Sequence, residues 1–342
     1  MNCTFPWTGM TIDPQGFLTL CCMIDSKKGL FNKHITEIDS LYDFFYGKEY
    51  DKVRLDFHKY GWENIKDCAA CLNDKRAGRF TTVDISQRFD SKKNTLQYLE
   101  LTTSNTCNQQ CVTCGSKFSS KWKKIEKYFD RPVESTYSLT TDDLEKVLEV
   151  LPDLEHLTLK GGEPFADMRN LQILISLLDI NRLCKITIIT NGVLIPKPFQ
   201  DIIKKYPYNF DIVFSIDAIG KRYDWIRGTP FKKTIENLKL ISSFAVDNVN
   251  IVPTISTFNV HNINEIIEWH DTLDIKTTLQ WSNVVHEPRW CSPIHTMTQE
   301  EINICNLPVK VISEYNEKYK VELEKNTKIM DKLRGFEFNS LQ

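Results

Sequence analysis

The sequence has no apolar run long enough to cross a membrane, and its first residues lack the pattern of a secretory signal peptide. We therefore expect a cytoplasmic protein without a membrane partner. Neither sign of charge predominates, because the chain has 43 lysines and arginines and 45 aspartates and glutamates, which gives a net charge of −2. Such a balance gives no general attraction for nucleic acid, and no Walker-type phosphate loop is present. The hydrophobic fraction of 41% is that of a globular protein.

Cysteine, by contrast, is abundant. The chain has eleven cysteines, and eight of them precede residue 115. A disulfide framework would need an oxidising compartment, and an odd count also argues against complete pairing. The clustering therefore predicts metal or cluster ligation in the first third of the chain. Cys184, Cys291 and Cys305 are isolated, and we interpret them as small buried apolar residues.

From Thr95 onward, short apolar runs alternate with helical patterns. This alternation predicts an α/β fold with a parallel sheet and right-handed crossovers. Six strands fall short of a closed eight-stranded barrel, so we expect an open partial (β/α)6 barrel with its chemistry at the carboxyl ends of the strands. The expected strands are residues 95–102, 156–164, 184–192, 210–218, 248–256 and 277–285. The expected helices between them are residues 140–151, 168–180, 231–244 and 261–272.

The sequence on either side of the barrel differs in character. Residues 1–90 are turn-rich and contain a predicted hairpin, with "DPQG" between "TGMTI" and "FLTLCC". Residues 288–342 are expected to be helical and to end in an amphipathic stretch near residues 309–334. We therefore expect three units: a small cysteine-rich N-terminal module over 1–90, a barrel over 91–287, and a helical C-terminal extension.

Three cysteines follow the first expected barrel strand in "CNQQCVTC", with the spacing C-x3-C-x2-C. No fourth cysteine follows closely enough to complete a local tetrad. One interpretation is a structural zinc site with a distant fourth ligand, because structural zinc requires four ligands. The other is an iron–sulfur cluster held by three thiolates with one open iron. The position of the triplet at the mouth of a barrel favours the second interpretation.

This triplet after the first barrel strand resembles the signature of the radical S-adenosylmethionine (SAM) enzymes. The resemblance implies that Cys107, Cys111 and Cys114 bind a [4Fe–4S] cluster whose open iron is chelated by SAM. It further implies reductive cleavage of SAM to methionine and a 5′-deoxyadenosyl radical, which takes a hydrogen atom from a substrate. The hypothesis from another class is a catalytically idle metal-binding scaffold that retains the fold.

Later strands end in polar motifs that match the same family. "GGEP" is similar to its glycine motif, where the strand edge and Glu163 bind the amino group of SAM. Ser215 and Asp217 of "SIDA" are similar to its ribose-binding positions, and Arg227 is placed to pair with the SAM carboxylate. Thr113 stands where the family commonly has an aromatic residue, so the adenine contacts are left unassigned. The predicted SAM-binding residues are Gly161, Gly162, Glu163, Pro164, Asn191, Ser215, Asp217 and Arg227, with Thr254 and Asn283 as weaker candidates.

The N-terminal cysteines resemble the SPASM/twitch extension, which carries an auxiliary [4Fe–4S] cluster in many radical SAM enzymes. Such modules usually follow the barrel, whereas this one precedes it. The resemblance implies Cys3, Cys21, Cys68 and Cys71 as ligands. Cys22 is the spare, because adjacent side chains in an extended strand point to opposite faces. The alternative for this module is a zinc knuckle.

The sequence does not name a substrate. Twitch-bearing relatives frequently modify peptides or proteins, so we expect a peptide or protein side chain, with a small sugar or nucleotide as the alternative. Trp281 and Trp290 are expected to line the lateral gap of the open barrel unless both belong to the core. We also expect an external electron donor such as flavodoxin or ferredoxin. His156, His286 and Glu287 are positional candidates for an acid or hydrogen donor.

Overall fold

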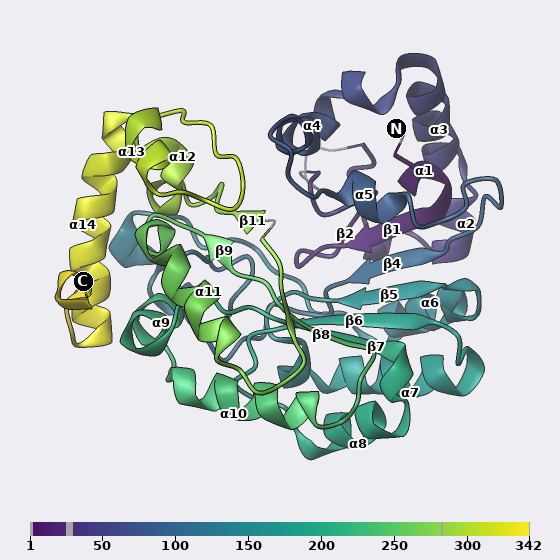
Figure 1. Ribbon diagram of the computed structural model, residues 1–342. Helices are drawn as coiled ribbons and strands as arrows, with labels where there is room; N and C mark the ends of the chain where they lie inside the picture. The colour runs from purple at the N-terminus through teal and green to yellow at the C-terminus, as the bar shows by residue number, and fades with distance from the viewer. Residues whose placement is uncertain (1–2, 25–29, 282, 342) are drawn as a thin grey trace.

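The computed structural model describes residues 3–24, 30–281 and 283–341. Its main element is a nine-stranded sheet in the order β10-β8-β7-β6-β5-β4-β1-β2-β3 (Figure 1), and a second ladder pairs β11 with β9. The strands are β1 (Gly9–Ile12), β2 (Phe17–Thr19), β3 (Lys33–His34), β4 (Tyr98–Leu101), β5 (His156–Leu159), β6 (Lys185–Thr190), β7 (Phe210–Phe214), β8 (Asn248–Ile251), β9 (Thr254–Ile255), β10 (Thr278–Leu279) and β11 (Asn283–Val284).

The six strands β4, β5, β6, β7, β8 and β10 are all parallel neighbours, and the sheet ends at β10 without closing. Each of them falls within one of the expected strands, so the prediction of an open partial barrel is confirmed. Successive side chains of a strand point to opposite faces of the sheet. In β7, Phe210, Ile212 and Phe214 are fully buried, whereas Asp211 and Val213 on the other face border a cavity on the concave side of the sheet.

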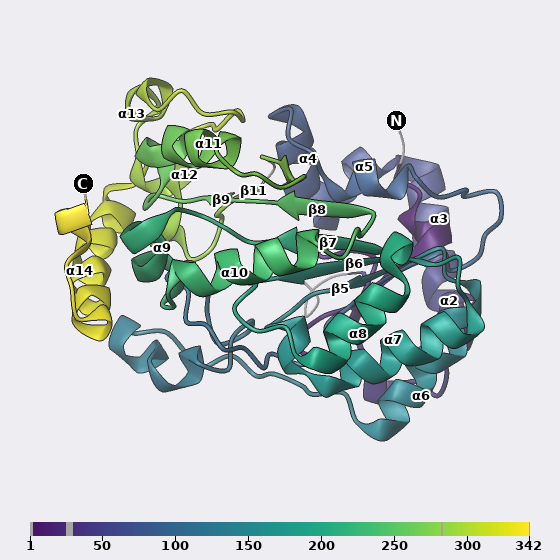
Figure 2. The same cartoon turned by 60° about the horizontal axis from the view of Figure 1, so that its bottom comes forward.

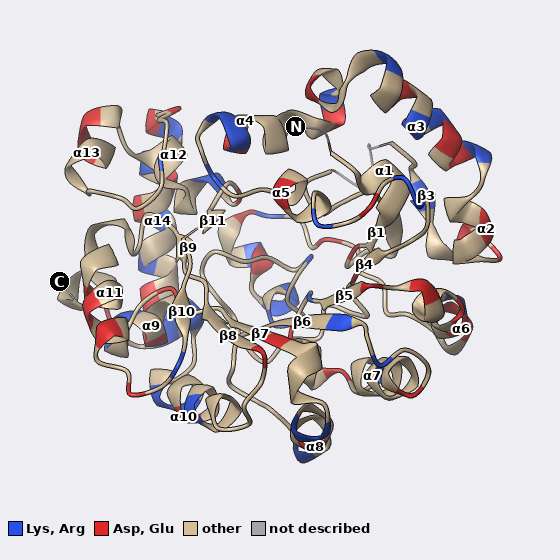
Figure 3. Cartoon of the chain, turned by 45° about the vertical axis from the view of Figure 1, so that its right-hand side comes forward, with Lys and Arg blue, Asp and Glu red and all other residues tan. Residues whose placement is uncertain are grey.

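Helices cover the convex side of this curved sheet. Figure 3 shows α6, α7, α8 and α10 outside the arc, with both signs of charge among the helices, and Figure 2 shows the same layer from below. The helices are α1 (Phe5–Thr8), α2 (Leu41–Phe45), α3 (Lys48–Tyr60), α4 (Ala69–Arg76), α5 (Thr82–Ser86), α6 (Thr141–Val150), α7 (Met168–Ile180), α8 (Lys197–Lys205), α9 (Gly220–Arg227), α10 (Phe231–Ser242), α11 (Ile263–Asp271), α12 (Pro293–Thr296), α13 (Gln299–Ile304) and α14 (Glu317–Arg334).

Local signals account for several of these boundaries. The expected helix at 140–151 begins with a capping box, in which Thr140 and Asp143 each accept a hydrogen bond from the other's backbone N–H. The last two expected strands are each divided, since β8 is followed by β9 and β10 by β11, and Ser282 lies outside the described residues. The amphipathic stretch expected from residue 309 becomes helical only at Glu317.

The N-terminal segment joins the barrel sheet. The predicted hairpin is present, with Thr11 opposite Thr19 in the β1–β2 pair. In addition, β1 pairs in parallel with β4, so that Gly9 lies beside Tyr98. Helices α4 and α5 lie across the open, concave side of the arc (Figure 3). The assignment of residues 1–90 as a twitch-like module stays a prediction.

The C-terminal segment packs against the opposite end of the barrel. Trp290 is buried, with its ring centroid 6.0 Å from that of Phe129 and 5.9 Å from that of Phe258. Trp281 is partly buried against a smaller apolar cluster that includes Val284. The expectation that Trp290 lines a gap was therefore wrong, because the apolar core encloses its ring. None of the described helices combines the length and apolar character that crossing a bilayer would require.

Candidate active site

The three thiols of "CNQQCVTC" lie in the loop after β4 and line one cavity of about 660 Å³. Burial, followed by the neighbouring charge of Cys111, raises the pKa of the Cys107 thiol to about 12. Burial, followed by Cys111 and then Cys107, also raises the pKa of Cys114. Three thiolates here would be mutually repulsive and poorly solvated. The donor set is therefore suited to a multiply charged metal centre, which stabilises thiolates.

Backbone contacts hold this loop in place. The Trp122 indole N–H donates to the carbonyl oxygen of Cys111 at 2.9 Å, and the Val112 N–H donates to the carbonyl oxygen of Ile226 at 2.8 Å. From the far end of the chain, the Arg334 guanidinium donates to the carbonyl oxygen of Gln110. The loop is therefore supported by α9 and by the end of α14 as well as by its own strand.

The glycine motif brings β5 against the same loop. The Glu163 N–H donates to the carbonyl oxygen of Thr106 at 2.7 Å. A Cβ on Gly162 would lie 2.1 Å from that oxygen, so only glycine permits this approach. Gly161 has a φ of +127°, a conformation that L side chains rarely adopt. Both glycines line the cavity, which gives a bound molecule direct access to the backbone.

Glu163 is buried next to the cavity but is not among its lining residues. Its side chain is 1% exposed, and its carboxylate accepts hydrogen bonds from Thr190 Oγ1 at 2.7 Å, the Phe165 N–H at 3.1 Å and the Asn191 N–H at 2.8 Å. Burial raises the pKa of this carboxyl to about 7, although the hydrogen bonds oppose the shift. Pro164 is buried at the start of the next 3-10 turn. Glu163 therefore ties the end of β5 to the end of β6.

Most of the other predicted SAM-binding residues border the cavity. Asn191, Ser215 and Asp217 line it just beyond β6 and β7, and Thr254 lines it from the start of β9. The Asn191 side chain donates to Asn108 Oδ1 at 2.7 Å and so contacts the cysteine loop. The weaker candidate Asn283 is exposed on β11 and is not among the lining residues of this cavity.

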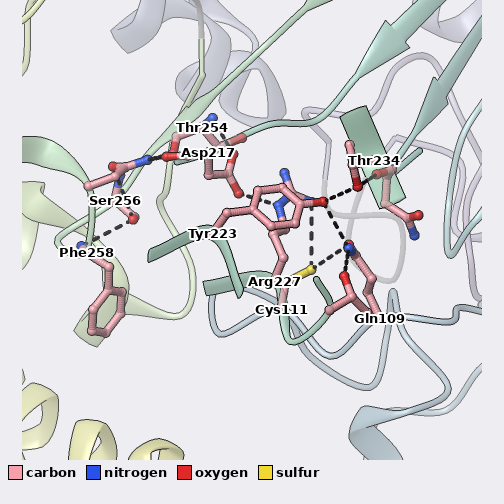
Figure 4. Close-up of polar contacts among 12 residues, drawn as sticks. Gln109, Cys111, Asp217, Tyr223, Arg227, Thr234, Thr254, Ser256 and Phe258 are labelled. Atoms are coloured by element: carbon pink, nitrogen blue, oxygen red, sulfur yellow. Dashed lines mark hydrogen bonds and ion pairs between the residues drawn. The ribbon is translucent and has the colours of Figure 1, made fainter. Parts of the chain in front are cut away.

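Arg227 lines the cavity but already has two neighbours (Figure 4). Its Nε lies 2.7 Å from Asp217 Oδ2, and its Nη1 donates to Cys111 Sγ at 3.7 Å. Asp217 also accepts from the Thr254 N–H at 2.8 Å. Arg227 thus lies between the predicted ribose-binding carboxylate and one of the three thiols.

Sequence reasoning missed several residues of this cavity. Gln109 is 1% exposed and connects Cys111 to Tyr223, and only its position between two cysteines could have suggested it. Lys160 lines the cavity beside the glycines and forms a 2.6 Å ion pair with Glu100. No sequence signal distinguished this pair from ordinary strand residues.

The N-terminal cysteines separate into two groups. Cys3, Cys21, Cys68 and Cys71 are buried free thiols. They are close enough to interact: after burial, Cys3 contributes to the raised pKa of both Cys21 and Cys68, and Cys71 to those of Cys3 and Cys68. Cys22 instead lines the main cavity, next to Lys160. The two adjacent cysteines therefore face different sites, although they lie in the turn after β2 and not in the strand itself.

Within the described ranges, no three His, Cys, Asp or Glu side chains converge on a point that a single metal ion could occupy. A four-iron cluster does not require such convergence, because each thiolate binds a different iron.

The candidates for an acid or hydrogen donor lie in different parts of the structure. His156 begins β5, at the opposite end of the strand from the glycines, and its ring Nε2 lies 2.9 Å from Thr187 Oγ1. Burial, followed by the charges of Arg88 and Lys185, lowers its pKa to about 4. His156 is therefore too far from the thiols to serve as a donor there. His286 and Glu287 do line the cavity.

A family model described as the Radical SAM superfamily matches residues 101–271, half of the chain. The chain therefore belongs to the radical SAM superfamily, for which SAM and a [4Fe–4S] cluster are the expected cofactors. The matched region contains the three thiols and the glycine motif.

Individual proteins that resemble this chain share little sequence identity with it. The chain is similar to the radical SAM cyclopropyl synthase TigE of Paramaledivibacter caminithermalis, with 26% identity over 194 residues, which cover 53% of this chain and 40% of that protein. Among solved structures it is similar to native anSMEcpe with bound AdoMet, with 18% identity, a TM-score of 0.44, and coverage of 70% of this chain and 62% of that one. It is also similar to Streptococcus suis SuiB bound to precursor peptide SuiA, with 16% identity, a TM-score of 0.42, and coverage of 84% and 60%. The chain thus spans less than two thirds of the length of each.

Replacing Gly162 by alanine should push the cysteine loop away from β5, since the new Cβ would overlap the Thr106 carbonyl oxygen. We expect the variant to retain less iron after anaerobic reconstitution and to bind SAM more weakly. The control is Gly220→Ala, where φ is +52° and nothing lies within 4 Å, so that only the backbone cost of about 1–2 kcal/mol applies. Equal iron content in the two variants would contradict the role given to Gly162.

Proposed function

We propose that this protein cleaves SAM reductively at a [4Fe–4S] cluster held by Cys107, Cys111 and Cys114, and that it acts on a peptide or protein side chain. The observation that carries the proposal is the meeting of three free thiols, the glycine edge of β5, the ends of β6 and β7 and the start of β9 around one cavity. When bound, the cluster and SAM supply a 5′-deoxyadenosyl radical. The chain's own residues bind, orient and shield these groups.

The cavity fits both cofactors. Its volume of about 660 Å³ lies in the range of small-molecule sites. The thiols at one end supply the soft anionic ligands that iron–sulfur clusters require. Beside them, the exposed backbone at Gly161 and Gly162 and the side chains of Asn191 and Ser215 offer hydrogen-bonding groups to the polar parts of SAM. Glu163 contributes from behind, by fixing the ends of β5 and β6.

Charge pairing in the cavity bears on the substrate. Its lysine and its arginine are each matched by a carboxylate, Lys160 by Glu100 and Arg227 by Asp217. A phosphorylated substrate would therefore meet little uncompensated positive charge. This balance favours a peptide side chain over a nucleotide or sugar phosphate. An unphosphorylated metabolite is the alternative.

Two segments outside the barrel core border the substrate side of the cavity. Cys22, Met23 and Ala70 come from the N-terminal module, and Val284 to Glu287 come from the segment at β11. His286 Nε2 lies 3.4 Å from Asp74 Oδ1, which links the two segments. We propose that an extended peptide reaches the cavity between them.

For the N-terminal module we propose an auxiliary [4Fe–4S] cluster on Cys3, Cys21, Cys68 and Cys71. Four buried thiols gathered in a small segment supply a complete ligand set. Burial raises the pKa of Cys3, Cys21 and Cys68, which makes the ionisation of these three thiols unfavourable without a metal. A cluster with all four irons ligated would transfer electrons or stabilise the module. We also propose that the electron comes from an external carrier such as flavodoxin or ferredoxin.

The activity is tested by replacing Cys107, Cys111 and Cys114 together with alanine. With dithionite and SAM under anaerobic conditions, the parent protein should form 5′-deoxyadenosine and the variant none, because the cluster has lost its thiolate ligands. Liquid chromatography with mass spectrometry measures the product. The variant should keep its fold, as judged by circular dichroism. Equal product from both proteins would contradict the assignment of the cluster to these thiols, and no product from the parent would support an idle scaffold.

The auxiliary site is tested by replacing Cys68 and Cys71 with alanine. Iron content should fall by about four atoms per chain, the size of one cluster. The N-terminal segment should also lose resistance to proteolysis, because ligation contributes to its folding. The triple-alanine variant of the barrel thiols is the matched control, since it should keep this iron. Zinc instead of iron after anaerobic reconstitution would identify a zinc knuckle.

The substrate class is tested with a mixed library of synthetic peptides and a separate panel of nucleosides, nucleotides and sugars. The peptides should increase 5′-deoxyadenosine formation and acquire a mass change that requires both SAM and Cys107. The Cys107→Ala variant is the control for adventitious oxidation. Stimulation by a metabolite alone, with every peptide unaltered, would exclude the peptide proposal.

A further inference from the structure

Gln109 is buried between two of the three thiols and contacts both. Its backbone N–H donates to Cys107 Sγ at 3.4 Å, and its side-chain Oε1 accepts from Cys111 Sγ at 3.4 Å. Its Nε2 donates to the Tyr223 hydroxyl at 3.2 Å and to Thr229 Oγ1 at 2.6 Å. Figure 4 shows this amide beside the Cys111 sulfur and the Tyr223 hydroxyl, with dashed lines to both.

The contact between Gln109 Oε1 and Cys111 requires a thiol hydrogen. A cysteine that ligates a metal is a thiolate and has no hydrogen to donate. An amide oxygen 3.4 Å from a thiolate sulfur would then be repelled, and a buried side chain has no water to relieve the repulsion. With Cys111 as a thiolate ligand, the amide would therefore be better placed in the opposite orientation, with its N–H groups toward the sulfur.

The other partners of Gln109 allow its amide to turn over. Tyr223 and Thr229 both contact it through hydroxyl groups, and a hydroxyl can donate or accept. After rotation, the oxygen would accept from these hydroxyls and the N–H would face the sulfur. Thr234 Oγ1 lies 2.8 Å from the Tyr223 hydroxyl and 3.2 Å from the Asn191 carbonyl oxygen, so it can serve either arrangement.

We propose that Gln109 is a positioning residue for the cluster: when Cys111 is a ligand, the amide turns over and donates a hydrogen bond to its sulfur. Arg227 Nη1 already donates to the same sulfur at 3.7 Å, so Cys111 receives two side-chain donors. Hydrogen bonds to ligand sulfurs stabilise the more negative, reduced cluster and raise its reduction potential. The inference rests on the proposed function, because it assumes the cluster on these thiols.

The experiment is a potentiometric titration of the reconstituted protein, followed by electron paramagnetic resonance. The signal of the barrel cluster is obtained by subtracting the spectrum of the triple-alanine variant. Gln109→Met keeps the length of the side chain but removes its N–H groups, so its midpoint potential should be more negative than that of the parent. At the parent's midpoint, clearly less than half of the barrel cluster should be reduced.

Gln110→Met is the matched control, because the neighbouring amide donates to the Lys121 carbonyl oxygen at 3.1 Å and not to a sulfur. Its potential should equal that of the parent. Tyr223→Phe removes one donor to the reversed amide and should shift the potential in the same direction as Gln109→Met, by less. This variant keeps the test decisive if Gln109→Met does not retain its cluster.

Two outcomes would overturn the inference while leaving the proposed function intact. One is an unchanged or more positive potential in Gln109→Met. The other is an unchanged potential in Tyr223→Phe. If the parent protein and the triple-alanine variant gave the same spectrum, no cluster would depend on Cys107, Cys111 and Cys114. That result would contradict the proposed function itself.

Discussion

The close approach of the backbone at Gly162 to the carbonyl oxygen of Thr106 determines the arrangement of the whole cavity. Because Gly162 has no Cβ, the next N–H, that of Glu163, reaches the Thr106 oxygen at 2.7 Å. The buried Glu163 carboxylate then accepts the Asn191 N–H and the Thr190 hydroxyl at the end of β6. The ends of β4, β5 and β6 are thereby fixed to one another, and the cysteine loop is fixed with them.

A second constraint is electrostatic. Four thiols, the carboxylates of Asp217, Glu287 and Glu100, a lysine and an arginine border or adjoin a partly enclosed space, where uncompensated charge is unfavourable. The ion pairs Arg227–Asp217 and Lys160–Glu100 remove most of the net charge apart from the thiols. A cationic cluster is then the natural counterpart of the three thiolates. The same balance leaves the remaining walls largely neutral, which suits an uncharged or zwitterionic ligand more than a polyanion.

The sequence was sufficient to predict the barrel, because each core strand is an apolar run followed by a polar motif at its carboxyl end. In a parallel sheet those motifs must meet at one edge, which is why the thiols, the glycines, Asn191, Ser215 and Asp217 line one cavity. The pairing of β1 with β4 was not predictable in this way. Strand β1 has four residues, and its partner is distant in the sequence, so local pattern carries no information about the pairing.

The orientation and contacts of individual side chains could not be predicted from the sequence either. The sequence did not reveal that the Glu163 carboxylate accepts hydrogen bonds from Thr190, Phe165 and Asn191, and its binding of SAM stays a prediction. Trp290 was ambiguous because a large aromatic residue suits both a core and a groove, and only packing against Phe129 and Phe258 decided it. Gln109 had only its position between two cysteines to suggest it, since its contacts with the Tyr223 and Thr229 hydroxyls lie far along the chain.

The parallel pairing of β1 with β4 also has a consequence for biosynthesis. Gly9 leaves the ribosome long before Tyr98, its neighbour in the sheet, has been made. Until then β1 has only β2 beside it and exposes an unpaired edge that includes Met10 and Ile12, both fully buried in the finished fold. Long-range parallel pairing forms slowly, and unpaired apolar edges promote aggregation. The nascent N-terminal segment therefore exposes this apolar edge until β4 has been made.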